Sequence, residues 1–340
     1  MTVRDPILIW GAGAIGGTLG AYWARAGHDV LLVDREAEHV EACRTSGLAI
    51  EGPVDSFTQV VPAATPRELT GRFSRAILAV KAHATEAALD ELTVRLAPDG
   101  FVLSAQNGLN ELAIARRVGE ARTMGCFVNF GADWLGPGRI LYGNRGAVVV
   151  GEIDGAIRPR TRDMHELLRA FEPDAVLTEN IWGYLWGKLA HGAMLFGTAL
   201  TPDSMSANFA DPERTLAWLA LGREVMAVAA ERGVEAVGFG EFRPEAFAPG
   251  AADADGRDTL AWLAEYTSRT AKTHSGIHRD LAVRKRPTEV DAQIGVIGAL
   301  GREHGVPTPA LDRLVELIHD IETGRRPQSA ETLGALLVPC

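Results

Sequence analysis

The 340-residue chain carries a formal net charge of −10, with 46% hydrophobic and 23% charged residues. This composition is ordinary for a globular protein that is long enough for two domains. The acidic balance argues against nucleic acid or an anionic membrane as the main partner. No apolar run approaches the roughly 18 residues of a membrane span. A strand begins within a few residues of the start and leaves no room for a signal peptide, so we expect a cytoplasmic protein.

The cysteines and histidines give no sign of a structural bridge or a metal. The three cysteines are odd in number, scattered and without CxxC spacing, which fits a reducing compartment and predicts neither a disulfide framework nor a zinc site. His191, His274 and His278 lack HExxH-type spacing, so we assign no metal. The cysteines are Cys43, Cys126 and Cys340.

An apolar run at residues 7–10 meets a glycine-rich turn, and an alanine-rich helical pattern follows. Gly11 permits the tight turn, Gly13 lets the backbone approach a pyrophosphate, and Gly16 lets helix and strand pack closely. The helix, expected at residues 14–26 and ended by Gly27, points its first amides at the phosphates. A GxGxxG motif in this context predicts dinucleotide binding rather than an unliganded turn. The expected contact residues are Gly11, Gly13, Ala14, Ile15 and Gly16.

Strand and helix patterns alternate up to about residue 175. Such alternation predicts an α/β Rossmann domain, at residues 1–178, with a doubly wound and mostly parallel sheet whose later strands are free to run differently. Ligands of such sheets lie beyond the carboxyl ends of the strands, where Asp34, Arg35, Lys81 and Asn107 are expected. Expected strands cover residues 7–10, 30–33, 48–50, 59–61, 76–80, 101–104, 125–130, 138–142 and 147–151, with helices at 36–46 and 84–96.

Helical patterns dominate the rest of the chain, so residues 179–340 are expected to form an all-α domain for substrate binding and dimerisation. We expect the substrate cleft between the two domains. The acidic, Gly- and Ala-rich stretch 248–257 is typical of an exposed loop or lid. The expected helices cover residues 182–200, 212–233, 259–272, 288–304 and 310–322.

Two stretches of this domain carry candidates for proton transfer and substrate binding. Lys188 lies in an aromatic-rich, largely apolar helix, where burial lowers a lysine pKa and makes it a usable acid. The alternative is a lysine that extends to the surface. Glu289 falls in the first turn of an expected helix, where it also suits the helix dipole alone. The basic run 284–286 is either a solvated face or an attraction for a carboxylate substrate.

Several motifs, taken together and in order, resemble those of the ketopantoate reductases (2-dehydropantoate 2-reductases) over nearly the whole chain. They are GAGAIGG (11–17), VKA (80–82), QNG (106–108), LWGKLA (185–190) and RPTEVD (286–291). The resemblance implies that Lys188 is the general acid and that Glu289 binds a substrate hydroxyl. It also implies that Asn107 lies between nicotinamide and substrate and that Ser275 binds the substrate carboxylate.

The chain departs from the family pattern where amide side chains are expected. Gly192, Phe196 and Lys272 stand at positions that carry asparagine in the family, and the segment between Ser275 and Glu289 is slightly longer and more basic. A pocket that loses such hydrogen-bonding groups loses much of its discrimination for a small polar substrate. We therefore expect a related 2-oxo acid or ketone, larger and more apolar than ketopantoate, with Lys272 among the substrate-binding residues.

The sequence contains opposite indications of whether the cofactor is NADH or NADPH. Asp34 follows the second strand, where an acid binds the ribose 2′-OH and repels a 2′-phosphate. Arg35 and Lys81 match family residues beside the 2′-phosphate and would attract it. The family is NADPH-dependent, so NADPH is slightly favoured and NADH, or use of both, stays open.

The sequence thus predicts a cytoplasmic, NAD(P)H-dependent reductase of 2-oxo acids, with Lys188 as acid and Glu289, Asn107 and Ser275 around the substrate. A homodimer is expected from the family. Three alternatives remain: a dehydrogenase that oxidises a secondary alcohol in catabolism, a nucleotide-sensing protein without turnover, and an opine-type dehydrogenase. The presence of both Lys188 and Glu289 speaks against a sensor, which needs no proton donor.

Overall fold

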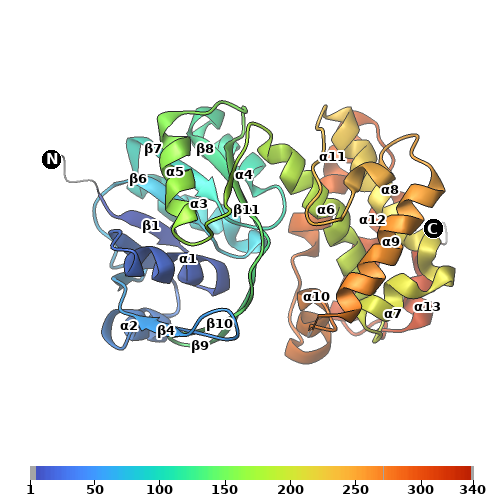
Figure 1. Ribbon diagram of the computed structural model, residues 1–340, viewed down its shortest axis with the longest axis horizontal. Helices are drawn as coiled ribbons and strands as arrows, with labels where there is room; N and C mark the ends of the chain where they lie inside the picture. Colours follow the sequence, from blue (N-terminus) through green and yellow to red (C-terminus); the bar gives the residue numbers. More distant parts are fainter. Residues whose placement is uncertain (1–4, 271, 338–340) are drawn as a thin grey trace. The chain divides into compact units, whose positions relative to one another are not determined.

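The computed structural model describes residues 5–270 and 272–337. The chain divides into two compact units, residues 1–181 and 182–340 (Figure 1), and each is treated by itself below. Cys43 and Cys126 are buried free thiols, and Cys340 lies outside the described residues. No helix in the described ranges is long and apolar enough to span a membrane.

The first unit is built on an eight-stranded sheet of order β12-β11-β8-β7-β6-β1-β2-β5. Its pairs are parallel except for β11 with β8, which run antiparallel. The doubly wound, mostly parallel sheet expected from the sequence is therefore confirmed. The strands are β1 (Ile7–Trp10), β2 (Val30–Val33), β5 (Ala63–Ala64), β6 (Phe73–Leu78), β7 (Leu96–Ser104), β8 (Thr123–Val128), β11 (Val148–Glu152) and β12 (Val176–Leu177).

Helices cover both faces of this sheet because alternate residues of each strand point to opposite sides. In β1, Ile7 and Ile9 pack in one buried cluster and Leu8 and Trp10 in another. The first cluster includes residues of α1, α2 and α5, and the second includes residues of α3 and α4. The helices are α1 (Ala14–Arg25), α2 (Ala37–Thr45), α3 (Thr85–Leu92), α4 (Asn110–Val118) and α5 (Pro159–Arg169).

A second, four-stranded sheet of order β4-β3-β10-β9 was not anticipated. It pairs β3 with a strand that lies far later in the chain, so no local pattern indicates it. Leu48 of β3 and Ile140 of β10 pack on α1 so closely that a Cβ on Gly17 would meet both side chains. The strands are β3 (Leu48–Glu51), β4 (Phe57–Gln59), β9 (Gly131–Gly136) and β10 (Arg139–Asn144).

The second unit is helical throughout its described residues apart from one isolated bridge, which confirms the all-α expectation. Its central helix, α6, is largely buried. Two short π-helical turns, Asp280–Arg284 and Asp291–Gly295, flank the segment that holds Glu289. The α-helices are α6 (Ile181–Thr198), α7 (Met205–Ala210), α8 (Thr215–Glu231), α9 (Asp253–Ser268), α10 (Gly276–Arg279), α11 (Val296–His304), α12 (Pro309–Glu322) and α13 (Ala330–Gly334).

The stretch 248–257 was wrongly expected to be a loop throughout, because α9 begins at Asp253. Asp253 and Asp255 lie in its first turn, where acidic side chains complement the helix dipole. Gly256 is buried because its missing side chain lets the helix approach Leu219. The polar composition thus marks a helix start, and only residues 248–252 remain loop.

Candidate active site

The glycine-rich turn has the backbone that the sequence predicts. Gly11 adopts φ +102°, and a Cβ there would lie 2.7 Å from the Val80 backbone nitrogen. A Cβ on Gly16 would collide with the Gly11 carbonyl and lie 2.9 Å from the Ala79 Cβ. By contrast, no atom lies within 4 Å of the Cβ position of Gly13, the N-cap of α1. The structure therefore leaves open space at the helix N-terminus where a pyrophosphate is expected.

Both backbone polar groups of Ala12 form hydrogen bonds with side chains. Its N–H donates to Asp34 Oδ2 at 2.8 Å, and its carbonyl accepts from His39 Nε2 at 2.8 Å. The Gly138 N–H donates to His39 Nδ1 at 2.9 Å, which fixes the proton on Nε2. His39 is thus a positioning residue that sequence reasoning missed. Its partners are 27 and 99 residues away in sequence, and no motif connects them.

Asp34, Arg35, Lys81 and Asn107 all follow strands of the parallel sheet, at the edge where the glycine-rich turn lies. Arg35 is exposed and its guanidinium is 2.8 Å from a carboxylate oxygen of Glu91 on α3. Lys81 and Asn107 are also exposed. The sequence therefore located these four residues correctly, while their roles remain predictions.

The loop after β7 is held by amide side chains. Gln106 Nε2 donates to the Val80 carbonyl at 2.9 Å and to Thr85 Oγ1 at 2.8 Å. Asn110 Nδ2 donates to the Asn107 carbonyl at 2.8 Å. Gln106 belongs to the QNG motif, yet nothing in its spacing showed that it ties this loop to the end of β6. These bonds fix the backbone from which the Asn107 side chain projects.

In the second unit, Lys188 lies on the partly exposed side of α6, and His191 follows one turn later. The His191 ring packs against Phe239 and Phe242, with centroid distances of 5.6 and 5.4 Å. Burial, and then the charge of Lys188, lower the pKa of His191 to about 4. The imidazole is therefore neutral at neutral pH.

The family asparagine positions on α6 have different surroundings. No atom lies within 4 Å of the Cβ position of Gly192, which leaves open space one turn from Lys188. Phe196, however, is 1% exposed and packs in the interior of the helical unit. The replacement of a family amide by its ring stays a prediction.

Ser275 is 3% exposed and forms the N-cap of α10, accepting a hydrogen bond from the His278 N–H at 3.1 Å. The residues before it are held to the segment after α6. The Met205 N–H donates to the Thr273 carbonyl at 2.9 Å, and His274 Nε2 donates to the Pro202 carbonyl at 3.1 Å. Lys272 is exposed at the start of this segment.

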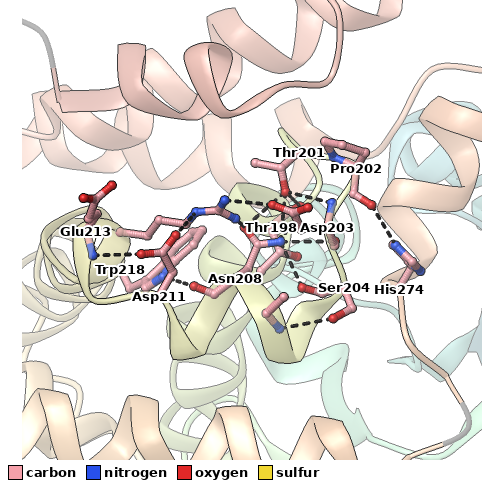
Figure 2. Close-up of polar contacts among 12 residues, drawn as sticks. Thr198, Thr201, Pro202, Asp203, Ser204, Asn208, Asp211, Glu213, Trp218 and His274 are labelled. Carbon is pink, nitrogen blue, oxygen red and sulfur yellow. Dashed lines mark hydrogen bonds and ion pairs between the residues drawn. The ribbon is translucent and has the colours of Figure 1, made fainter.

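The residues around Pro202 form a polar network that is centred on the buried side chain of Asn208 (Figure 2). Asn208, which is fully buried, exchanges hydrogen bonds with Thr201 and accepts one from Arg214 at 2.7 Å. Arg214 also pairs with Asp203 at 2.7 Å. A buried amide whose hydrogen bonds are satisfied in this way favours one loop conformation. The network therefore fixes the loop on which the Ser275 segment rests.

Glu289 lies between the two π-helical turns, and its carbonyl accepts from the Gln293 N–H. The preceding Thr288 is held by Glu322 of α12, which accepts from both its N–H and its hydroxyl, at 2.7 and 2.8 Å. π-Helical turns are often found at functional sites. The backbone of Glu289 is thus positioned by defined contacts.

The basic run before it has a structural partner. Arg284 Nη1 and Arg286 Nε both donate to Asp280 Oδ1 at 3.0 Å. The single carboxylate of Asp280 thus offsets one of the three positive charges of the run. The run is therefore not simply a solvated face, and its attraction for a carboxylate is reduced.

The open turn at Gly13, the helix N-terminus beyond it and the acid after β2 fit a nicotinamide dinucleotide in the first unit. Within residues 5–270 and 272–337, no group of three or more His, Cys, Asp or Glu side chains is placed to hold a metal.

Comparison with protein families gives two matches that follow one another along the chain. Residues 7–155 match the model described as "Ketopantoate reductase PanE/ApbA", and residues 180–322 match "Ketopantoate reductase PanE/ApbA C terminal". A curated 2-dehydropantoate 2-reductase from Mesorhizobium japonicum is 31% identical, covering 94% of this chain and 98% of that protein. One from Archaeoglobus fulgidus is 28% identical with the same coverage.

Solved structures show the same fold. D-mandelate dehydrogenase in complex with NADH and anilino(oxo)acetate is similar with a TM-score of 0.81 at 23% identity, covering 94% of this chain and 99% of that one. A ketopantoate reductase from Ralstonia eutropha gives a TM-score of 0.78 at 24% identity with the same coverage.

Proposed function

The chain belongs to the ketopantoate reductase family and is an NAD(P)-dependent oxidoreductase that acts on CH–OH groups, and we propose that it reduces a 2-oxo acid to the 2-hydroxy acid. The observation that carries this proposal is the position of Lys188 beside a neutral His191 on α6. Ser275 and Glu289 lie in segments whose backbones are held by defined hydrogen bonds. The same unit thus carries the proposed proton donor and the candidates for substrate binding.

A reduced nicotinamide, when bound, supplies the hydride for such a reaction. The chain must then stabilise and protonate the carbonyl oxygen as negative charge develops. Lys188 Nζ is the proposed donor, because the neutral imidazole of His191 has no acidic proton of comparable strength. Ser275 is proposed to bind the substrate carboxylate, Glu289 to orient the substrate, and Asn107 to contact it beside the cofactor.

We propose further that the substrate is larger and more apolar than ketopantoate, for example a 2-oxo acid with an aryl group. The open space at Gly192 supports this, since an amide found there in the family is missing. The structural similarity to D-mandelate dehydrogenase, solved with anilino(oxo)acetate, also supports it. That enzyme is named for the oxidation of a 2-hydroxy acid, so the reverse reaction is a second candidate activity.

The first test is a panel of ketopantoate, 2-oxo-3-methylbutanoate and phenylglyoxylate, with kcat/KM measured for both NADH and NADPH. We expect phenylglyoxylate to be the best of the three. Lys188→Met should reduce kcat by about 10²- to 10⁴-fold, the range for a general acid, while cofactor binding persists. A ligand response that survives in Lys188→Met, with no turnover in the wild type, would favour the sensor alternative.

The second test addresses the space at Gly192. Gly192→Asn restores the family amide and should shift the kcat/KM ratio toward ketopantoate by about tenfold, within the range of pocket discrimination. Gly192→Ala is the matched control, because it adds volume without the amide. Equal effects of both variants, or ketopantoate as the best wild-type substrate, would contradict the proposal of an aryl substrate.

We also propose a homodimer. A ketopantoate reductase from Staphylococcus aureus described as dimeric has the same fold, with a TM-score of 0.73 and 20% identity. Light scattering on the purified chain measures the assembly directly.

A further inference from the structure

The residues after β2 combine two opposite signals for the adenosine end of a dinucleotide. An acid at this position binds the ribose 2′-hydroxyl and repels a 2′-phosphate, whereas an arginine accommodates the 2′-phosphate. This chain has Asp34 directly followed by Arg35. The hydrogen bonds and ion pairs around the two side chains distinguish between them.

Asp34 is fixed at the glycine-rich turn. Its Oδ2 accepts from the Ala12 N–H at 2.8 Å and its Oδ1 from the Glu36 N–H at 3.1 Å. Ala12 is 1% exposed, so rotation of the carboxylate away from the turn would leave a buried N–H without its partner. Each carboxylate oxygen has a second acceptor site, which remains suited to a ribose hydroxyl. A 2′-phosphate at the same place would be repelled by the carboxylate of Asp34, which these hydrogen bonds hold in position.

Arg35, in contrast, is paired with another acid. Its Nη2 is 2.8 Å from Glu91 Oε1, and both side chains are exposed. An exposed ion pair of this kind is weak, so Glu91 does not lock the guanidinium. It does place a second carboxylate beside any phosphate that Arg35 would bind. Glu36 adds a further exposed acid next to Arg35 in sequence.

We propose that Asp34 makes this chain prefer NADH to NADPH and that Glu91 strengthens the preference by pairing with Arg35. This differs from the slight preference for NADPH that the family resemblance implied. It rests on the proposed function only in that the chain binds a nicotinamide dinucleotide. Lys81 still favours the phosphorylated cofactor, so the preference is a ratio of affinities and not an exclusion.

The test is the dissociation constant of NADH and of NADPH, measured by quenching of tryptophan fluorescence without any substrate. The wild type should bind NADH about tenfold more tightly, a difference of about 1.4 kcal/mol. Asp34→Asn keeps an acceptor for the Ala12 N–H but removes the charge. It should tighten NADPH binding by about tenfold and weaken NADH binding slightly.

Glu91→Gln should tighten NADPH binding by about two- to fivefold, the range of an exposed charge pair, and leave NADH unchanged. Glu86→Gln is the matched control, because Glu86 lies on the same helix and faces a different arginine, Arg116, at 3.6 Å. It should change neither constant. Equal effects of the two variants would overturn the role of Glu91 and indicate only a general change in surface charge.

Tighter binding of NADPH than of NADH by the wild type, or an unchanged ratio in Asp34→Asn, would overturn the inference while leaving the proposed reductase function intact. Binding of neither dinucleotide by the folded protein would overturn the proposed function together with the inference. The two failures are therefore distinguishable in one set of titrations.

Discussion

In the first unit, the residues expected around the cofactor follow neighbouring parallel strands. In the second unit, the residues expected around the substrate come from a helix, a loop and a segment between two π-helical turns. A parallel sheet converts order in sequence into position in space, because the carboxyl ends of its strands share one edge. The helical unit has no such rule. The segments that carry Ser275 and Glu289 are held by individual hydrogen bonds, which single substitutions can remove.

The largest expected effects contrast two glycines of the same turn. Gly16→Ala should prevent stable folding of the first unit, since the new Cβ would collide with the Gly11 carbonyl. Gly13→Ala meets open space, so its melting temperature should stay near that of the wild type. Its affinity for NADH should nevertheless fall by about tenfold or more, because the methyl group stands where the pyrophosphate approaches. Thermal melts and cofactor titrations measure the two effects separately.

A Gly13→Ala protein that binds NADH as tightly as the wild type would contradict the placement of the pyrophosphate at the glycine-rich turn. The sheet edge would then position the residues without forming the dinucleotide site. Loss of folding in both variants would mean that the turn tolerates no side chain at all.

The difference between local and long-range structure also explains which features the sequence predicts correctly. The helix at Ala14–Arg25, its glycine-rich N-terminus and the polar residues after β2, β6 and β7 were found because short motifs and strand periodicity determine them locally. The four-stranded second sheet and the His39 contacts were missed, because they join segments far apart in sequence. Long-range pairing leaves no local signature.

In the helical unit, motif resemblance identified Lys188, Ser275 and Glu289 but said nothing of their surroundings. Phe196 is buried within α6, and Arg284 pairs with Asp280 inside a π-helical turn, and the motifs indicate neither. The helix start at Asp253 was mistaken for a loop because acidic and glycine residues favour both. A helix N-terminus and a polar loop share a composition, and packing decides between them.

A second prediction concerns pH and compares two buried glutamates of the first unit. Burial raises the pKa of Glu111 to about 8, so its carboxyl is neutral in the folded state below that pH. The unfolded chain releases this proton near pH 4.5. Stability from this group is therefore full below about pH 4.5 and is lost as the pH rises toward 8. Relative to the wild type, Glu111→Gln should gain up to a few kcal/mol at pH 9 and little at pH 5.

Glu152 is the control for that experiment, because it is equally buried but meets a charge. Its carboxylate accepts two hydrogen bonds from Arg160, at 2.8 and 2.6 Å, and one from Thr161. Glu152→Gln should lose about 1–3 kcal/mol at both pH values, since a bond to a charged group is removed. Denaturant melts at pH 5 and pH 9 give both numbers. A Glu111→Gln variant that loses stability at pH 9 would contradict the raised pKa.

The smallest expected effect lies in the second unit and separates a structural serine from a substrate-binding one. Ser275 and Ser204 both cap short helices, and each accepts a backbone N–H at 3.1 Å. Replacing either by alanine should therefore cost about 1 kcal/mol of stability, or about 2–4 °C in melting temperature for a unit of this size. Only Ser275→Ala should also raise KM for the 2-oxo acid, by about tenfold, if its hydroxyl binds the substrate carboxylate in addition to capping α10. Ser204→Ala is the matched control, because it removes a similar cap elsewhere in the unit. If the two variants have equal melting temperatures but only Ser275→Ala raises KM, Ser275 contacts the substrate. If the two variants have equal KM values, Ser275 only holds the backbone.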